Sequence, residues 1–140
     1  MNLQLYTDGG ARNNPGPGAI GVLICNAEGE ELTRHNAFIG EATNNIAEYC
    51  ALIAGLELAS QYKPDKLQCF LDSELVVNQM NGKYKVKNER IKVLYNEVKS
   101  QETGFMNISY THVPRNHEKM KIVDKLVNQS LDEEQRKARQ

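Results

Sequence analysis

The composition of the chain excludes several classes of protein. Of its 140 residues, 40% are hydrophobic and 25% are charged, which is typical of a compact globular domain and not of a disordered chain. Seventeen Lys and Arg against eighteen Asp and Glu give a net charge of -1. This balance excludes histone-like bulk binding of nucleic acid but leaves room for a local basic patch. We therefore expect a single domain over residues 1–140.

The chain also lacks the sequence signals of membrane insertion and secretion. No apolar run approaches the ~20 residues that a membrane span needs, and the first residues do not resemble a signal peptide. The three cysteines, Cys25, Cys50 and Cys69, are widely spaced in apolar stretches, which argues against a disulfide framework and against a zinc site. We expect a cytoplasmic protein without a membrane partner, with its cysteines in the core.

The first half of the chain predicts strands followed by a helix. Residues 3–8 alternate like a strand that ends at two glycines, and a dense cluster of turn residues follows at 11–18. Residues 19–25 and 31–39 predict two further strands joined by a short turn. Helical periodicity begins after Thr43 and ends at Pro64, because proline cannot donate the helical hydrogen bond.

The second half predicts strands alternating with helices. Residues 67–71 are apolar on both faces, as in a buried central strand. Helices are expected at 73–80 and 88–99, a strand at 106–113, and a last helix after Pro114. This order predicts an α/β fold with a mixed sheet, in which an antiparallel meander is continued by parallel strands reached through helices.

Four acidic residues fall where such a fold would bring them together. Asp8 and Asp72 stand at the predicted carboxyl ends of two strands, where open α/β sheets bind ligands. Glu48 lies one turn into the first long helix, and Asp124 lies in the first turns of the last helix. Converging carboxylates repel each other, which favours a bound divalent cation, and oxygen ligands suit Mg²⁺. Two such ions can activate water and stabilise the leaving oxygen of a phosphodiester.

Each of these acids also has a simpler structural interpretation. Glu48 has the spacing of a helix capping box with Asn45, and Asp72 could cap the helix that follows it. Asp8 before two glycines could form a turn, and Asp124 on a charged helix could simply be solvated. The joint placement of all four favours the catalytic interpretation.

Four acidic segments follow one another along nearly the whole chain. They are Tyr6-Thr7-Asp8-Gly9-Gly10 with Asn13-Asn14-Pro15-Gly16-Pro17-Gly18, Thr43-Asn44-Asn45-Ile46-Ala47-Glu48, Leu71-Asp72-Ser73, and His112-Val113-Pro114-Arg115 with Asp124-Lys125-Leu126-Val127-Asn128. Their order and content resemble type 1 ribonuclease H. The resemblance implies a ribonuclease H-like α/β fold, with a five-stranded mixed sheet of three antiparallel and then two parallel strands, flanked by helices. It also implies endonucleolytic hydrolysis of the RNA strand in RNA–DNA hybrids, leaving 5′-phosphate and 3′-hydroxyl ends.

The resemblance assigns roles to individual residues. It implies that two Mg²⁺ ions, for which Mn²⁺ can substitute, are bound by the four acids Asp8, Glu48, Asp72 and Asp124. It places Asn14, Asn44 and Asn45 where the family reads ribose 2′-hydroxyls, which an amide can do because it both donates and accepts hydrogen bonds. Thr43 and Asn88 match positions that hold a phosphate of the DNA strand, and Gly9 is an expected substrate contact. Taken alone, each asparagine could serve in a turn or cap instead. We expect a monomer.

Two features depart from the family pattern in the middle of the chain. Longer members carry a basic, tryptophan-rich protrusion, whereas this chain has only residues 82–87 there and no tryptophan. A basic stretch around Tyr84 remains, and its alternative is an exposed loop; it consists of Lys83, Lys85, Lys87, Arg90 and Lys92. We expect Lys85 to contact the hybrid. Glu41 stands where some relatives place an arginine that binds phosphate, which predicts a lower affinity.

The segment before Asp124 differs most from the family pattern. Met120 and Val123 stand where the family commonly has Asn and Ala, and the preceding loop is longer. Glu118 in that loop is the competing candidate for the fourth metal ligand. His112 and His117 are candidates for a histidine that assists proton transfer or product release in some relatives, with a structural role as the alternative for each.

Two other functions remain open for a chain with these motifs. One is a catalytically silent module of the same fold that binds hybrids or a protein, and the other is a DNA nuclease or integrase of this fold. The presence of all four acids argues against the first, and the asparagines at the 2′-hydroxyl positions argue against the second. We expect an active, short ribonuclease H.

Overall fold

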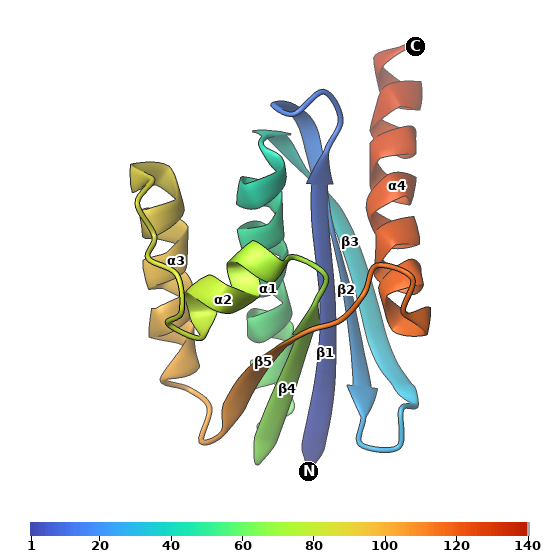
Figure 1. Ribbon diagram of the computed structural model, residues 1–140. Coiled ribbons are helices and arrows are strands. Elements are labelled where there is room, and N and C mark those ends of the chain that lie inside the picture. The colour runs from blue at the N-terminus through green and yellow to red at the C-terminus, as the bar shows by residue number, and fades with distance from the viewer. Residues whose placement is uncertain (140) are drawn as a thin grey trace.

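The computed structural model describes residues 1–139, which form one mixed sheet and the helices packed on it (Figure 1). In chain order the elements are β1 (Asn2–Ala11), β2 (Gly16–Asn26), β3 (Glu31–Ala42), α1 (Asn44–Ser60), β4 (Lys66–Leu71), α2 (Glu74–Met80), α3 (Glu89–Glu102), β5 (Ile108–His112) and α4 (Glu118–Ala138). The sheet order is β3-β2-β1-β4-β5. The first three strands pair antiparallel, and β4 and β5 continue the sheet in parallel. The predicted fold class is confirmed.

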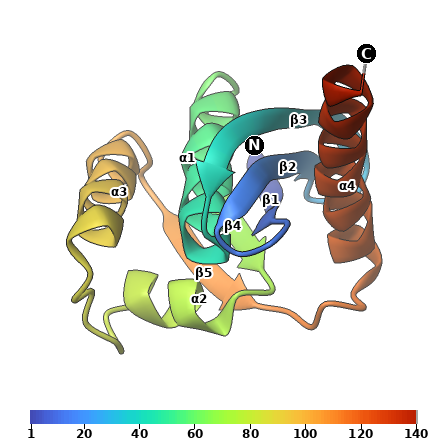
Figure 2. The same ribbon diagram turned by 90° about the horizontal axis from the view of Figure 1, so that it is seen from above.

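Helices cover both faces of the sheet. Viewed from above, α1 and α3 lie on one side and α4 lies on the other (Figure 2). Successive side chains of β1 point to opposite faces: Leu5 packs in the larger core with α1, and Tyr6 packs in the smaller core with α4. Met120 and Val123 of α4 are buried in that smaller core, which accounts for apolar residues where the family pattern has Asn and Ala.

The first strand runs further than the sequence predicts. It continues through Gly9 and Gly10 to Ala11 and stays paired with β2 over this stretch. A Cβ atom on Gly9 would lie 2.1 Å from the carbonyl oxygen of Ala47 in α1, so glycine is required here for the close approach of the helix. The prediction that the two glycines end the strand was therefore wrong.

The ends of three elements turn toward one end of the sheet. Strand β4 ends at Leu71, and Ser73 caps α2 by accepting a hydrogen bond from the backbone N–H of Val76. Thr43 caps α1 in the same way, accepting from Ile46. The carboxyl ends of β1 and β4 and the amino end of α1 thus meet, as expected for a ligand site in an open α/β sheet.

In the described part of the chain, no helix combines the length and the apolar character needed to cross a membrane.

Candidate active site

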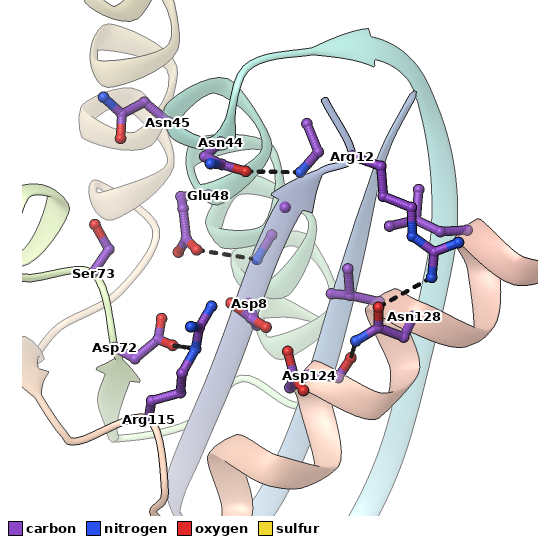
Figure 3. Close-up of a pocket in the computed structure, with 15 residues that line it drawn as sticks. Asp8, Arg12, Asn44, Asn45, Glu48, Asp72, Ser73, Arg115, Asp124 and Asn128 are labelled. Atoms are coloured by element: carbon purple, nitrogen blue, oxygen red, sulfur yellow. Dashed lines mark hydrogen bonds and ion pairs between the residues drawn. The ribbon is translucent and has the colours of Figure 1, made fainter. Parts of the chain in front are cut away.

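Three carboxylates from three different elements meet at this end of the sheet. Tyr6 of β1 pairs with Phe70 of the parallel strand β4, so the same register carries Asp8 alongside Asp72. Glu48 reaches the pair from α1 (Figure 3). One ligand oxygen of each of the three carboxylates lies within 4.8 Å of the others. The predicted convergence of Asp8, Glu48 and Asp72 is confirmed.

Burial and mutual repulsion make these carboxyls hold protons more tightly than usual. Burial, followed by the charge of Asp72, raises the pKa of Asp8 to about 7. Burial, followed by the charge of Asp8, also raises the pKa of Glu48 well above its usual value. Burial raises the pKa of Asp72 too, although Arg115 opposes the shift. Without a cation, the cluster is therefore partly protonated near neutral pH.

The donor set fits a divalent cation. Glu48 Oε1 accepts a hydrogen bond from the backbone N–H of Gly9 at 3.4 Å. Its second oxygen, Oε2, is buried and finds no hydrogen-bond partner among residues 1–139. A buried carboxylate oxygen without a partner is destabilising unless something satisfies it. Because the neighbouring ligand atoms are also carboxylate oxygens, the missing partner has the character of a hard cation such as Mg²⁺.

The fourth acid, Asp124, approaches from the opposite face of the sheet. It is half-buried near the start of α4, and its charge contributes to the raised pKa of Asp8 and of Asp72. It lines a pocket of about 660 Å³ together with Asp8, Glu48 and Asp72, although it lies outside the tight group of three. Glu118 begins α4 and is not among the residues that line this pocket.

The simpler interpretations of the acids do not describe the structure. Thr43, and not the pair of Asn45 and Glu48, caps α1, while Ser73, and not Asp72, caps α2. Asp8 lies inside β1 and not in a turn. All four acids line the same pocket.

A second pocket adjoins the first. Its volume is about 550 Å³, and Asn44 and Asn45 line both pockets. The second pocket also contains the predicted substrate residues Asn14, Thr43 and Asn88. It lies where the first residues of α1 and α3 meet, and helix amino termini favour anions. Arg90, which the sequence placed only in the basic stretch, adds a positive charge there.

Three asparagines of these pockets use their side-chain oxygens as acceptors, which leaves their amide groups as donors. Asn14 Oδ1 accepts from the backbone N–H of Asn44 at 3.0 Å, and Asn44 Oδ1 accepts from that of Ala11 at 2.9 Å. Asn88 Oδ1 caps α3 by accepting from Arg90 and Ile91. Asn88 thus has the cap role that was its alternative, whereas the bonds of Asn14 and Asn44 join α1 to the β1–β2 connection and to the end of β1. All three residues also line a pocket.

The remaining predicted substrate residues are divided between two places. Gly9 lines the first pocket. Lys85 does not reach either of the two pockets; it lines a third one, of about 450 Å³, with Tyr84, Lys92 and Tyr95. Glu41 near the end of β3 is exposed and is not among the residues that line the second pocket.

The two histidines have different environments. His117 Nδ1 caps α4 by accepting from the backbone N–H of Lys119, and its ring stacks on Tyr6 with centroids 5.5 Å apart. These two contacts support the structural alternative for His117, and the cap marks where α4 starts after the longer loop. His112 ends β5 and helps to oppose the rise in the pKa of Asp72.

Several residues that line the first pocket had no role predicted from the sequence. Arg115 Nε lies 3.8 Å from Asp72 Oδ2, and Arg12 and Asn128 form hydrogen bonds at the rim. The signal for Arg115 and Asn128 was their place inside the quoted motifs, whereas Arg12 lies in the turn between two of them.

Comparison with known proteins identifies the family. The family model described as "Reverse transcriptase-like" matches residues 6–130. Ribonuclease HI of Halobacterium salinarum is 38% identical over 131 residues, which cover 94% of this chain and 65% of the relative. The bifunctional protein Rv2228c of Mycobacterium tuberculosis is 38% identical over 94% of this chain, but the match covers only 36% of that relative. The chain therefore spans less than two thirds of the length of these curated relatives.

Solved structures agree over nearly the whole chain. RNase H1 from Halobacterium salinarum superposes with a TM-score of 0.90 at 36% identity, covering 95% of this chain and 99% of that one. The amino-terminal RNase H domain of Rv2228c superposes with a TM-score of 0.93 at 36% identity, covering 99% of this chain and 99% of that one. LC11-RNase H1, solved in complex with an RNA/DNA hybrid, superposes with a TM-score of 0.87 at 41% identity, covering 94% of this chain and 97% of that one. With the carboxylate cluster at the expected place, the chain belongs to the ribonuclease H1 family.

Proposed function

We propose that this chain hydrolyses the RNA strand of RNA–DNA hybrids, as an endonuclease that leaves 5′-phosphate and 3′-hydroxyl ends. The observation that carries the proposal is the buried cluster of Asp8, Glu48 and Asp72, with an unpartnered oxygen of Glu48. Support comes from LC11-RNase H1, a relative of nearly the same length that binds an RNA/DNA hybrid.

The four acids would hold two Mg²⁺ ions, for which Mn²⁺ can substitute. Asp8 lies between Glu48 and Asp72 on one side and Asp124 on the other, so we assign it to both ions (Figure 3). When bound, such ions supply Lewis-acid chemistry: they favour deprotonation of the attacking water and stabilise charge on the leaving 3′-oxygen.

The chain's own groups would position the substrate around this cluster. Asn44 and Asn45 line both pockets, and Asn44 has its Oδ1 already bonded, so its Nδ2 is set to donate to a ribose 2′-oxygen. Only RNA offers that oxygen, which would select the RNA strand for cleavage. Thr43, Asn88 and Arg90 would hold a phosphate of the DNA strand in the second pocket, at the ends of α1 and α3. Lys85, in the segment before α3, would contact the hybrid from the third pocket, which Lys92 and Tyr95 of α3 also line.

Three further expectations remain proposals. We propose that residues 1–140 form one domain and that it acts as a monomer, because a single chain contributes all four acids. We also propose a cytoplasmic location.

One experiment tests the proposed activity. The protein is incubated with end-labelled RNA–DNA hybrid, double-stranded RNA and double-stranded DNA, in Mg²⁺ or in chelator. We expect cleavage only of the RNA strand of the hybrid, and only with the cation. Cleavage of DNA would favour a nuclease or integrase of the same fold, and binding without cleavage would favour a silent module.

A further inference from the structure

Arg12 connects the turn between β1 and β2 to the last helix, α4. It follows β1 directly, four residues after Asp8. Its guanidinium donates from Nη2 to Asp132 Oδ1 at 2.7 Å and to Asn128 Oδ1 at 3.2 Å, and from Nη1 to Gln135 Oε1 at 2.9 Å. All three acceptors belong to α4.

These acceptors form a single stripe that leads to Asp124. Residues 128, 132 and 135 are spaced four and three apart, so they share one face of the helix, and Asp124 continues that face by one more turn. Asn128 makes the connection directly, since its Nδ2 donates to the backbone carbonyl of Asp124 at 3.0 Å while its Oδ1 accepts from Arg12 (Figure 3).

Besides its apolar packing on Tyr6 of β1, α4 has two backbone attachments, which come from β2 and β3. A Cβ on Gly21 of β2 would lie 2.4 Å from the carbonyl oxygen of Val123, so the helix backbone rests on that glycine. Asn36 of β3 donates to the carbonyl oxygen of Leu126 at 2.9 Å. These contacts set how closely the helix packs on the sheet, whereas Arg12 ties the Asp124 face to the strand that carries Asp8.

We propose that Arg12 is a positioning residue for Asp124. Its hydrogen bonds to Asn128, Asp132 and Gln135 set the rotation of α4 about its axis, and this rotation sets the position of the Asp124 carboxylate relative to Asp8. This inference rests on the proposed function. The side chains of Arg12 and Asp132 are 32% and 59% exposed, so their ion pair contributes little to stability, and its importance is geometric. Lysine cannot replace it fully, because an ammonium lacks the planar fork that reaches several acceptors at once.

The test compares Arg12→Ala and Arg12→Lys with a matched control, Arg34→Ala. Arg34 is also an arginine in an ion pair, but its partner Glu31 lies with it in β3, and neither lines the active-site pocket. Three quantities are measured for each variant: kcat and KM on the hybrid, and the affinity for Mn²⁺ by calorimetry without substrate.

We expect Arg12→Ala to lower kcat about tenfold with KM changed less than about twofold, and Arg12→Lys to lie between it and the wild type. We expect weaker Mn²⁺ binding in both Arg12 variants and wild-type values for Arg34→Ala. In an Asp124→Asn background, Arg12→Ala should lower kcat no further, because both changes act on the same group. Asn128→Ala, which breaks the connection elsewhere, should reproduce the loss.

Three results would overturn the proposal: unchanged kcat and Mn²⁺ affinity in Arg12→Ala, a rise in KM alone, which would make Arg12 a substrate contact, or full additivity with Asp124→Asn. Failure of the proposed function is a separate result, since it would leave the wild type inactive on the hybrid. The calorimetric comparison of Arg12 variants would then still decide whether Arg12 positions the acids.

Discussion

Burial of Asp8 has opposite consequences for function and for stability. The residue is 6% exposed, and its pKa rises from 3.8 to about 7 on folding, mainly through loss of water. Between those two values the folded state binds more protons than the unfolded state, so the stability of the metal-free protein falls as pH rises through this range. Below pH 3.8 this contribution disappears, because the carboxyl is protonated in both states. The repulsion that a cation would relieve is thus a stability penalty in its absence.

Replacing Asp8 with asparagine should therefore separate activity from stability. We expect Asp8→Asn to reduce hybrid cleavage by a factor of about a thousand or more, because the ligand assigned to both ions is lost. In chelator at pH 8, its free energy of unfolding should exceed that of the wild type by on the order of 1 kcal/mol, and the difference should vanish near pH 4. Cleavage assays and urea denaturation at both pH values measure these changes.

The matched control for this prediction is Asp65→Asn. Asp65 is an exposed aspartate just before β4, at the opposite end of that strand from Asp72, and it pairs with the amino terminus. Its substitution should leave cleavage unchanged. An Asp8→Asn protein with near-normal turnover would refute the assignment of the site.

Single substitutions can also decide whether Asp124 or Glu118 is the fourth metal ligand. Asp124 lines the pocket and acts electrostatically on Asp8, whereas Glu118 begins α4 near Tyr6 and its charge contributes to the raised pKa of that tyrosine. We expect Asp124→Asn to lower kcat at least tenfold and to shift the Mg²⁺ optimum upward, and Glu118→Gln to change either quantity less than about twofold. Parallel metal titrations of the two variants measure this. A larger loss in Glu118→Gln would reverse the assignment.

At the scale of elements, periodicity predicted the strands and helices, but their ends depended on contacts between distant parts of the chain. Gly9 and Gly10 have the local character of a strand end, yet β1 continues through them because it stays paired with β2. Residue 9 is glycine because the backbone of α1 at Ala47 leaves no room for a Cβ. Likewise, the longer loop before α4 could not be placed from the pattern, because its end depends on His117 capping the helix and stacking on Tyr6. The acids of the first pocket were predictable, since strand ends and helix starts converge in this fold.

The packing of α1 on β1 can be tested at Gly9. A Cβ there would meet the carbonyl oxygen of Ala47 at 2.1 Å, and backbone cannot move aside as a flexible side chain can. We expect Gly9→Ala to destabilise the protein by about 3 kcal/mol or more. It should also lower activity, because the Gly9 N–H donates to Glu48.

Gly104→Ala is the control for this change. The nearest atom to a Cβ on Gly104 is the carbonyl oxygen of Gln101 at 3.5 Å, an ordinary contact. Its stability should differ from wild type by less than about 0.5 kcal/mol. Urea denaturation of both variants compares their free energies of unfolding. Equal values would show that the backbone of α1 near Ala47 can move to make room for a Cβ at position 9.

Over the whole molecule, the net charge of -1 conceals a separation of charge. The acids gather in the first pocket, while Arg90 lines the second and Lys85 and Lys92 line the third, where the α2–α3 connection meets α3. A hybrid held by its DNA phosphates in the second pocket would extend from the acids toward the lysines. The short connection between α2 and α3 would then contact the hybrid at the place where longer relatives carry a protrusion.

Neutralising Lys83, Lys85 and Lys87 together tests this arrangement. Each phosphate contact releases counterions, so the loss of three should raise KM several-fold at low salt and reduce the slope of log KM against log salt by about 2 to 3. The value of kcat should stay within about twofold, because the acids of the first pocket are untouched. The matched control replaces three exposed lysines, Lys63, Lys121 and Lys137, which line none of these three pockets and should leave the slope unchanged. If both triple variants shift KM equally, the attraction is a property of total charge, and the lysines beside Tyr84 form only a solvated surface.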